Sequence, residues 1–177
     1  MSWVKEHIRT VPDYPLAGIQ FRDMTTLFQE ADAFARMIEA LVSHYENRRF
    51  DKVVGIEARG FVLGGVLAEK LKAGFVPVRK AEKLPYETRT MSYRKEYGTD
   101  FLELHVDGIK PGENVLLVDD LIATGGTAEA AIKLIRAGNG IVEDACFIID
   151  LPDLGGSDLL RSLDIAVVTL AEYGEDD

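Results

Sequence analysis

Two adjacent carboxylates, a loop of small residues and the start of a helix follow one another in the segment 115–127. Val115-Leu116-Leu117-Val118 is uniformly apolar, the pattern of a strand that is covered on both faces. Asp119-Asp120 follow it at once, and the chain then runs through Gly125-Gly126 into an Ala-rich stretch. In open parallel sheets, ligands bind where the carboxyl ends of the strands meet their loops. The segment therefore predicts a binding site at the end of a buried strand.

The loop has the properties that a phosphate monoester requires. Glycines let the backbone approach a ligand closely, threonine hydroxyls add donors, and the following helix offers free N–H groups at the positive end of its dipole. The two carboxylates precede the loop, where they can accept hydrogen bonds from sugar hydroxyls. We expect a sugar phosphate to be bound by Asp119, Asp120, Ala123, Thr124, Gly125, Gly126 and Thr127.

An ordinary strand–turn–helix junction is the competing interpretation, with glycine supplying a positive φ and an aspartate capping the helix. Two acidic residues at the end of an apolar strand weigh against it, because unpaired carboxylates near a core are costly. The patterns G-x-x-x-x-G-K-[ST] and G-x-G-x-x-G are absent, which disfavours ATPase and NAD-binding functions.

A basic segment stands out in an acidic chain. Residues 79–95 contain six basic and two acidic residues, a net charge of +4, whereas the whole chain has a formal net charge of −10. Such an island can concentrate a polyanionic ligand at one place. A solvated loop, whose charges only keep it soluble, is the alternative.

Strands alternate with helices along the chain. Periodicity predicts helices over 33–48, 59–72 and 127–136, and strands over 53–56, 75–78, 101–106, 115–118, 145–149 and 165–170. Residues 80–100 are polar and mixed, and no regular element is predicted there. This alternation indicates βαβ units and a mostly parallel sheet, so the predicted class is α/β.

Composition narrows the classes of protein. The chain has 177 residues, 47% of them hydrophobic and 28% charged, as expected of one soluble globular domain. Its negative charge disfavours binding to nucleic acid or anionic membranes. Cys146 is the only cysteine and the three histidines have no metal-ligand spacing, so no disulfide and no protein-held metal site are expected. Neither a signal peptide nor a membrane-spanning stretch is evident, and we expect a cytoplasmic protein.

Five segments together resemble a known family. The segment 118–127 is similar to the signature with which type I phosphoribosyltransferases bind phosphoribosyl pyrophosphate. Four more segments, in matching order and spacing, resemble the adenine-specific branch of that family: residues 14–23, 55–61, 75–80 and 96–100. The resemblance covers essentially the whole chain.

The resemblance implies a role for individual residues. Glu96 matches the proposed acid/base glutamate, with Tyr97 beside it in a mobile lid. Arg59, Arg79, Lys80 and Lys83 match residues that hold pyrophosphate. The adenine pocket would be formed by Gln20, Phe21 and Arg22, with Phe21 stacked on the base.

The same resemblance implies the reaction and the architecture. Adenine and phosphoribosyl pyrophosphate would give AMP and pyrophosphate, with Mg²⁺ bound through the substrate, in a chain that is usually a homodimer. The fold would be one phosphoribosyltransferase domain over 1–177, with an N-terminal base-binding hood at 1–30 and a flexible lid at 80–100.

Two other functions stay open at this point. One is a phosphoribosyltransferase for a 6-oxopurine, which the adenine-like segments disfavour. The other is a regulator that senses phosphoribosyl pyrophosphate without catalysis, which the acidic charge and short chain disfavour. Ala17 replaces a frequent proline of the family, and Ala81-Glu82 replaces a more basic pair, which adds a negative charge beside the pyrophosphate region.

Overall fold

The computed structural model describes residues 1–94 and 98–174, with the backbone alone for Arg94. The chain divides into two compact units, residues 1–46 and 47–177. The first unit contains α1 (Ser2–Glu6), β1 (Arg9–Pro12), β2 (Gln20–Asp23), α2 (Thr25–Gln29) and α3 (Ala31–His44). The helices of the second unit are α4 (Arg59–Leu71), α5 (Gly126–Ala137), the 3-10 helix η1 (Pro152–Leu154) and α6 (Gly156–Arg161). Its strands are β3 (Lys52–Ile56), β4 (Gly74–Lys80), β5 (Thr88–Arg94), β6 (Thr99–His105), β7 (Asn114–Val118), β8 (Leu121–Ile122), β9 (Ile141–Asp150) and β10 (Ala166–Glu172).

The first unit is an antiparallel hairpin with three helices. β1 pairs with β2 from Arg9–Asp23 to Pro12–Gln20. The apolar stripe that predicted the helix over 33–48 is the buried side of α3, where Met37 and Leu41 are fully buried. The helix ends at His44, earlier than predicted, and Tyr45 caps it with its backbone N–H.

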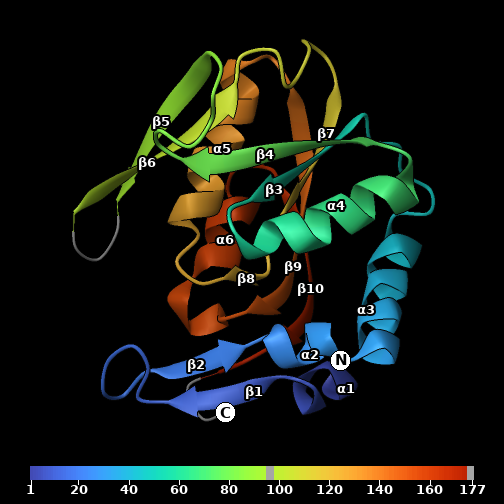
Figure 1. Ribbon diagram of the computed structural model, residues 1–177, viewed down its shortest axis with the longest axis vertical. Coiled ribbons are helices and arrows are strands. Elements are labelled where there is room, and N and C mark those ends of the chain that lie inside the picture. The colour runs from blue at the N-terminus through green and yellow to red at the C-terminus, as the bar shows by residue number, and fades with distance from the viewer. Residues whose placement is uncertain (95–97, 175–177) are drawn as a thin grey trace. The chain divides into compact units, whose positions relative to one another are not determined.

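The second unit is built on a mostly parallel sheet, which confirms the predicted α/β class. Within the described residues the strand order is β10-β9-β7-β3-β4-β6-β5, and β8 pairs with β9 (Figure 1). The pairs from β10 to β4 are parallel, and β6 is antiparallel to both β4 and β5. β3 and β7 are adjacent at the centre, so the loops after both strands lie at the same edge of the sheet.

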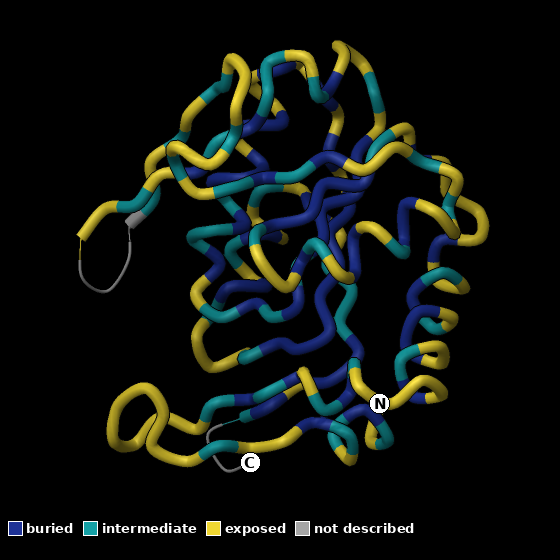
Figure 2. Tube along the Cα trace, viewed as in Figure 1, coloured by how far each residue is buried: buried dark blue, intermediate teal, exposed yellow. Residues whose placement is uncertain are grey.

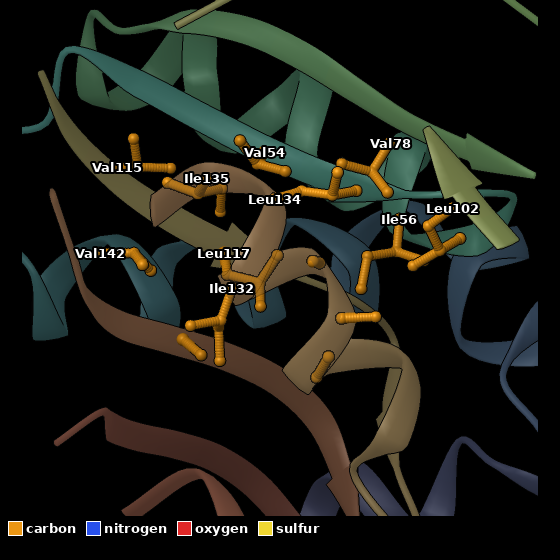
Figure 3. Close-up of a cluster of buried hydrophobic side chains, with 14 of the residues drawn as sticks. Val54, Ile56, Val78, Leu102, Val115, Leu117, Ile132, Leu134, Ile135 and Val142 are labelled. Atoms are coloured by element: carbon orange, nitrogen blue, oxygen red, sulfur yellow. The ribbon is translucent and has the colours of Figure 1, made fainter. Parts of the chain in front are cut away.

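Helices cover both faces of this sheet, which explains its uniformly apolar central strands. Val54 and Leu117 face α5, and Figure 3 shows them against Ile132 and Ile135 of that helix. Gly55, which points the opposite way from Val54, lies against α4. A Cβ atom on Gly55 would be 2.7 Å from the carbonyl oxygen of Gly60. A glycine is therefore required for α4 to begin so close to β3.

The segment 80–100 contains a strand that the sequence pattern did not predict. From Arg89 to Tyr93 the residues of β5 alternate between partly buried and exposed, and Met91 and Tyr93 pack against the core of the second unit. Figure 2 shows the β5–β6 hairpin as mostly intermediate and exposed, in contrast to the buried central strands. The strand was missed in the sequence because few apolar residues mark its buried face and its exposed face is polar. The hood at 1–30 and the flexible lid at 80–100 stay predictions.

Asp23 anchors the hairpin of the first unit. Its carboxylate accepts hydrogen bonds from Thr25 Oγ1 (2.6 Å), from Thr25 N (3.0 Å) and from Arg9 Nε (3.2 Å). These bonds, that of the Thr25 hydroxyl foremost, lower the pKa of Asp23 from 3.8 to about 2.

We expect Asp23→Asn to lower the free energy of unfolding by about 1–2 kcal/mol at pH 7, because a lowered pKa stabilises the folded state above the unfolded pKa. That stabilisation is lost as the pH falls through 2. In urea unfolding, the difference from wild type should therefore narrow between pH 4 and pH 2. Glu39→Gln, at an exposed acid of α3, is the control. A difference that does not change with pH would contradict this account.

Candidate functional site

Two turns meet at the carboxyl ends of β3 and β7. We call residues 57–60, after β3, the first turn and residues 119–127, after β7, the phosphate loop. A Cβ atom on Gly60 would be 2.8 Å from the Val118 carbonyl oxygen and 3.0 Å from Asp119 Oδ1. Arg59 Nε also donates a hydrogen bond to Asp120 Oδ2 across the two turns. The structure thus brings Arg59 together with both predicted aspartates.

The phosphate loop encloses a cavity of about 200 Å³. Asp119 lines it, whereas Asp120 does not and is buried against Arg59. The cavity is also lined by four residues that the sequence motif did not identify: Leu121, Ile122, Ala128 and the buried Phe147 of β9. All the other predicted phosphate-loop residues line the cavity: Ala123, Thr124, Gly125, Gly126 and Thr127.

Backbone donors are left available in the phosphate loop. Gly125 has a φ of +81° and is the N-cap of α5, with no side chain capping the helix. Within residues 1–94 and 98–174, the N–H groups from Thr124 to Thr127 have no hydrogen-bond acceptor. Free N–H groups at the positive end of a helix dipole bind anions. The loop therefore has the chemistry of a phosphate site.

The two aspartates differ in their electrostatic environment. Burial, and after it the charge of Asp120, raises the pKa of Asp119 well above its usual value. The Asp120 N–H, which donates to Asp119 Oδ1 at 2.9 Å, acts in the opposite direction. A carboxylate that is costly to ionise gains more than an exposed one from a ligand that donates hydrogen bonds or brings positive charge.

Glu57 is a residue of the site that sequence reasoning missed. Its carboxylate accepts hydrogen bonds from Arg79 Nη2 (2.8 Å), Arg79 Nε (3.2 Å) and Lys80 N (3.2 Å). The hydrogen bond from Arg79 is the main cause that lowers the pKa of Glu57. Arg79 Nη1 also donates to the Lys83 carbonyl oxygen at 3.0 Å. Glu57 directly follows a buried strand, as Asp119 does, and this signal could have identified it.

The predicted pyrophosphate residues fall into two groups. Arg79 is engaged by Glu57 and links the first turn to the segment after β4. Lys80 and Lys83 are exposed, and within the described residues neither ammonium group donates a hydrogen bond. The charge of Lys83 also contributes to the lowered pKa of Glu57. Arg79 is thus positioned as a support, with the two lysines beside it.

The predicted adenine residues all lie on β2 in the first unit. Phe21 is partly buried, with its ring edge-on to Tyr14 at 5.2 Å between centroids. Arg22 is buried and donates a hydrogen bond to Thr10 Oγ1 at 2.6 Å. Gln20 is exposed. The predicted catalytic pair, Glu96 and Tyr97, lies outside the described residues.

Across residues 1–94 and 98–174, no group of three or more His, Cys, Asp and Glu side chains could hold a metal ion. No helix in the same residues has the length and apolar character needed to cross a bilayer.

Two carboxylates and a loop of available N–H groups at the end of a central parallel strand are typical of α/β proteins that bind anionic ligands. Comparison with known proteins gives its family. Residues 24–167 match the phosphoribosyl transferase domain. The chain is 58% identical over 170 residues to an adenine phosphoribosyltransferase of Bradyrhizobium sp. (strain ORS 278), which covers 96% of this chain and 95% of the relative.

Solved structures agree with this relationship. The adenine phosphoribosyltransferase of Rhodothermus marinus is 49% identical with a TM-score of 0.91, and 97% of each chain is covered. That of Saccharomyces cerevisiae, solved with adenine and an imino-altritol bisphosphate, is 39% identical with a TM-score of 0.90, covering 96% of this chain and 97% of its own. The chain belongs to the phosphoribosyltransferase family and, within it, to the adenine phosphoribosyltransferases.

Because ionised Asp119 is unfavourable in the folded protein, we expect Asp119→Asn to raise the melting temperature. A gain of roughly 1 kcal/mol would correspond to about 2–4 °C in a protein of this size. A raised pKa makes the folded state more stable at low pH and less stable as the pH rises through that pKa. The difference should therefore be largest at high pH and narrow in thermal scans as the pH falls towards the ordinary pKa of 3.8.

Asp107→Asn, at an exposed acid between β6 and β7, controls for the loss of one negative charge. An equal rise in both variants, or a fall in Asp119→Asn, would show that Asp119 is not destabilising.

Proposed function

We propose that this chain transfers the 5-phosphoribosyl group of phosphoribosyl pyrophosphate to adenine, forming AMP and pyrophosphate in purine salvage. One observation carries the proposal for the site. Residues 124–127, whose N–H groups have no acceptor in the described part of the chain, line the same cavity as Asp119, next to Arg59. Phosphate, ribose and pyrophosphate groups need to be bound side by side in this way.

The phosphate loop holds the 5-phosphate and the ribose. The N–H groups and the hydroxyls of Thr124 and Thr127 donate to the phosphate oxygens. Asp119 accepts hydrogen bonds from the ribose hydroxyls. Asp120 acts mainly by orienting Arg59, because its carboxylate is buried and already accepts from that guanidinium.

Pyrophosphate binds to the basic groups of the first turn, of the end of β4 and of the segment that follows β4. Arg59, Lys80 and Lys83 offset the charge that develops on the departing diphosphate. Glu57 and Arg79 hold the first turn and the Lys83 backbone in place. Charge stabilisation of this kind favours the oxocarbenium-like state at the anomeric carbon.

The adenine side and the proton transfer rest on the family resemblance. Phe21 stacks on the base, the backbone at Gln20 reads its edge, and Arg22 supports β2 through Thr10. Glu96 accepts the proton of the attacking nitrogen, with Tyr97 beside it in the lid. Closure of the lid excludes water, which would otherwise hydrolyse the activated sugar.

Mg²⁺ fits this donor set as a cofactor that arrives with the substrate. Mg²⁺ is usually held by one or two carboxylates together with substrate phosphates rather than by an all-protein cage. Asp119 is a carboxylate in the cavity whose raised pKa a nearby cation would lower. When bound, the ion neutralises charge on the diphosphate and thereby eases its departure.

A homodimer and a cytoplasmic location are further parts of the proposal. Val62 of α4 and Phe75 of β4 are 45% and 38% exposed. Phe75 is packed edge-on to Phe61 at 5.8 Å between centroids. This apolar surface, formed by Phe61, Val62 and Phe75, suits contact with a second copy of the chain.

The activity test measures pyrophosphate release with phosphoribosyl pyrophosphate, Mg²⁺ and one base at a time: adenine, guanine, hypoxanthine, xanthine or orotate. We expect activity with adenine alone, because the adenine pocket should reject a 6-oxopurine. Glu96→Gln should lower kcat by about 10²–10⁴-fold, the contribution of a positioned general base. Glu87→Gln, in the same segment, is the matched control.

Turnover of a 6-oxopurine would contradict the base assignment and leave the fold assignment intact. Binding of phosphoribosyl pyrophosphate with no turnover of any base would contradict the enzymatic function and favour a regulator.

For the dimer, we expect wild type to elute at twice the chain mass in light-scattering chromatography and Val62→Glu to elute as a monomer. A buried glutamate without a partner is costly at an apolar interface. Ile141→Glu changes another exposed apolar residue of the second unit, 42% exposed at the start of β9, and should remain dimeric. A monomeric wild type at micromolar concentration would refute the dimer.

A further inference from the structure

The carbonyl groups of the phosphate loop are held from behind by one segment of the chain. The Asp120 carbonyl oxygen accepts hydrogen bonds from Ile148 N (2.9 Å) and Ile149 N (3.0 Å). Farther along the loop, the Ile122 carbonyl oxygen accepts from Leu151 N at 3.0 Å. The Ala123 carbonyl oxygen accepts from Gly156 N at 2.9 Å. The position of residues 148–156 therefore fixes the path of the loop.

The backbone at Gly156 is in direct contact with the backbone of the phosphate loop, because no side chain lies between them. A Cβ atom on Gly156 would be 2.3 Å from the Ala123 carbonyl oxygen and 2.7 Å from Gly125 N. A Cβ atom on Gly125 would be 3.0 Å from both Cα and O of Gly156. A small displacement of Gly156 would thus move Gly125, one of the residues whose N–H groups line the phosphate cavity.

One buried hydrogen bond between side chains holds Gly156 in place. Ser157 and Asp150 are each 3% exposed, and Ser157 Oγ donates to Asp150 Oδ2 at 2.6 Å. Within the described residues, Asp150 Oδ1 has no hydrogen-bond partner. Asp150 also ends β9 and accepts a backbone hydrogen bond from Tyr173 N at 3.0 Å. The Ser157 hydroxyl is therefore the side-chain donor that satisfies this buried carboxyl.

We propose that Ser157 and Asp150 are positioning residues for the 5-phosphate, acting through Gly156 on the phosphate loop. This inference rests on the proposed function, since it takes the loop to be the phosphate site. Neither residue lines the cavity, so each acts on the loop and not on the ligand. Without the Ser157 hydroxyl, Asp150 loses its donor and α6, which has only six residues, can shift at its first turn.

The 5-phosphate and the pyrophosphate group of the substrate should respond differently to a change at Ser157 or Asp150. The pyrophosphate residues lie on the first turn, at the end of β4 and directly after it, away from residues 150–157 in the sheet order. A loss of positioning at Gly156 should therefore weaken ribose 5-phosphate binding and leave pyrophosphate binding unchanged. A merely structural role would lower the melting temperature and leave both binding constants as they are.

The test compares Ser157→Ala with the conservative Ser157→Thr and with Ser162→Ala. Ser162 is the matched control, because its hydroxyl also donates within α6, to the Leu159 carbonyl oxygen at 2.6 Å, at the exposed far end of the helix. For Ser157→Ala we expect a roughly tenfold higher Kd for ribose 5-phosphate and KM for phosphoribosyl pyrophosphate, as for the loss of a hydrogen bond to a charged group. The Kd for pyrophosphate and the KM for adenine should stay within about twofold.

Ser157→Thr, which keeps the hydroxyl, should restore most of the affinity, and Ser162→Ala should equal wild type. An unchanged Kd for ribose 5-phosphate in folded Ser157→Ala would overturn the proposal. So would an equal loss of pyrophosphate affinity. If Ser157→Ala does not fold, Asp150→Asn replaces it, with the same selective loss expected at about threefold and an unchanged Kd again decisive against the proposal.

Binding of ribose 5-phosphate by wild type distinguishes the proposed function of the loop from the positioning role of Ser157 and Asp150. Failure of wild type to bind ribose 5-phosphate would refute the proposed function of the loop itself. Binding by wild type with no selective loss in the variants would refute only the positioning role.

Discussion

The contact between the turns after β3 and β7 is the constraint on which the site depends. These strands are neighbours in a parallel sheet, so their carboxyl ends must release the chain at the same edge. Gly60 lies against Val118 and Asp119, and Arg59 is paired with Asp120 across the two turns. A side chain at position 60 would force the turns apart and separate the cation from the carboxylates. The packing of α5 on one face of these two strands (Figure 3) and the close approach of α4 to Gly55 on the other face help to keep them adjacent.

Electrostatics shows the cost of this arrangement. Two carboxylates follow one another at the end of β7, where Val115 to Val118 are buried, and burial is the main cause that raises the pKa of Asp119. Arg59 is paired directly with Asp120, while Asp119 gains a backbone N–H and the more distant charge of Arg59, which do not offset its burial and the charge of Asp120. A site with a carboxylate that is costly to ionise and with several N–H groups that have no acceptor in the described residues is less stable empty than filled, because a ligand with hydroxyls and phosphate satisfies both. Local destabilisation of this kind is expected where a sequence is selected for binding.

The sequence predicted those features that depend on local pattern. The apolar run before Asp119-Asp120 predicted the buried strand that ends at Val118, the Ala-rich stretch predicted the helix after the small residues, and alternation of elements predicted the α/β class. Features that depend on contacts between distant segments were missed. The strand β5 is supported by α5 and β6, and the engagement of Arg79 by Glu57 joins residues 22 positions apart. From the sequence alone, Arg79 was interpreted as a pyrophosphate ligand, because its acidic partner Glu57 becomes evident only in the structure.

The carbonyl groups and the N–H groups of the phosphate loop have different roles, and this difference explains how so short a segment can be a rigid site. The carbonyl oxygens of Asp120, Ile122 and Ala123 accept hydrogen bonds from backbone N–H groups of residues 148–156. Within residues 1–94 and 98–174, the N–H groups of 124–127, which line the cavity, have no acceptor. One peptide unit, that between Ala123 and Thr124, belongs to both sets. Because a trans peptide is planar with its carbonyl and N–H on opposite sides, the hydrogen bond from Gly156 N to the Ala123 carbonyl oxygen orients the Thr124 N–H. The affinity of the loop for an anion therefore also depends on residues that do not contact the anion. The supporting segment 148–156 is as much a part of the site as the motif of residues 119–127.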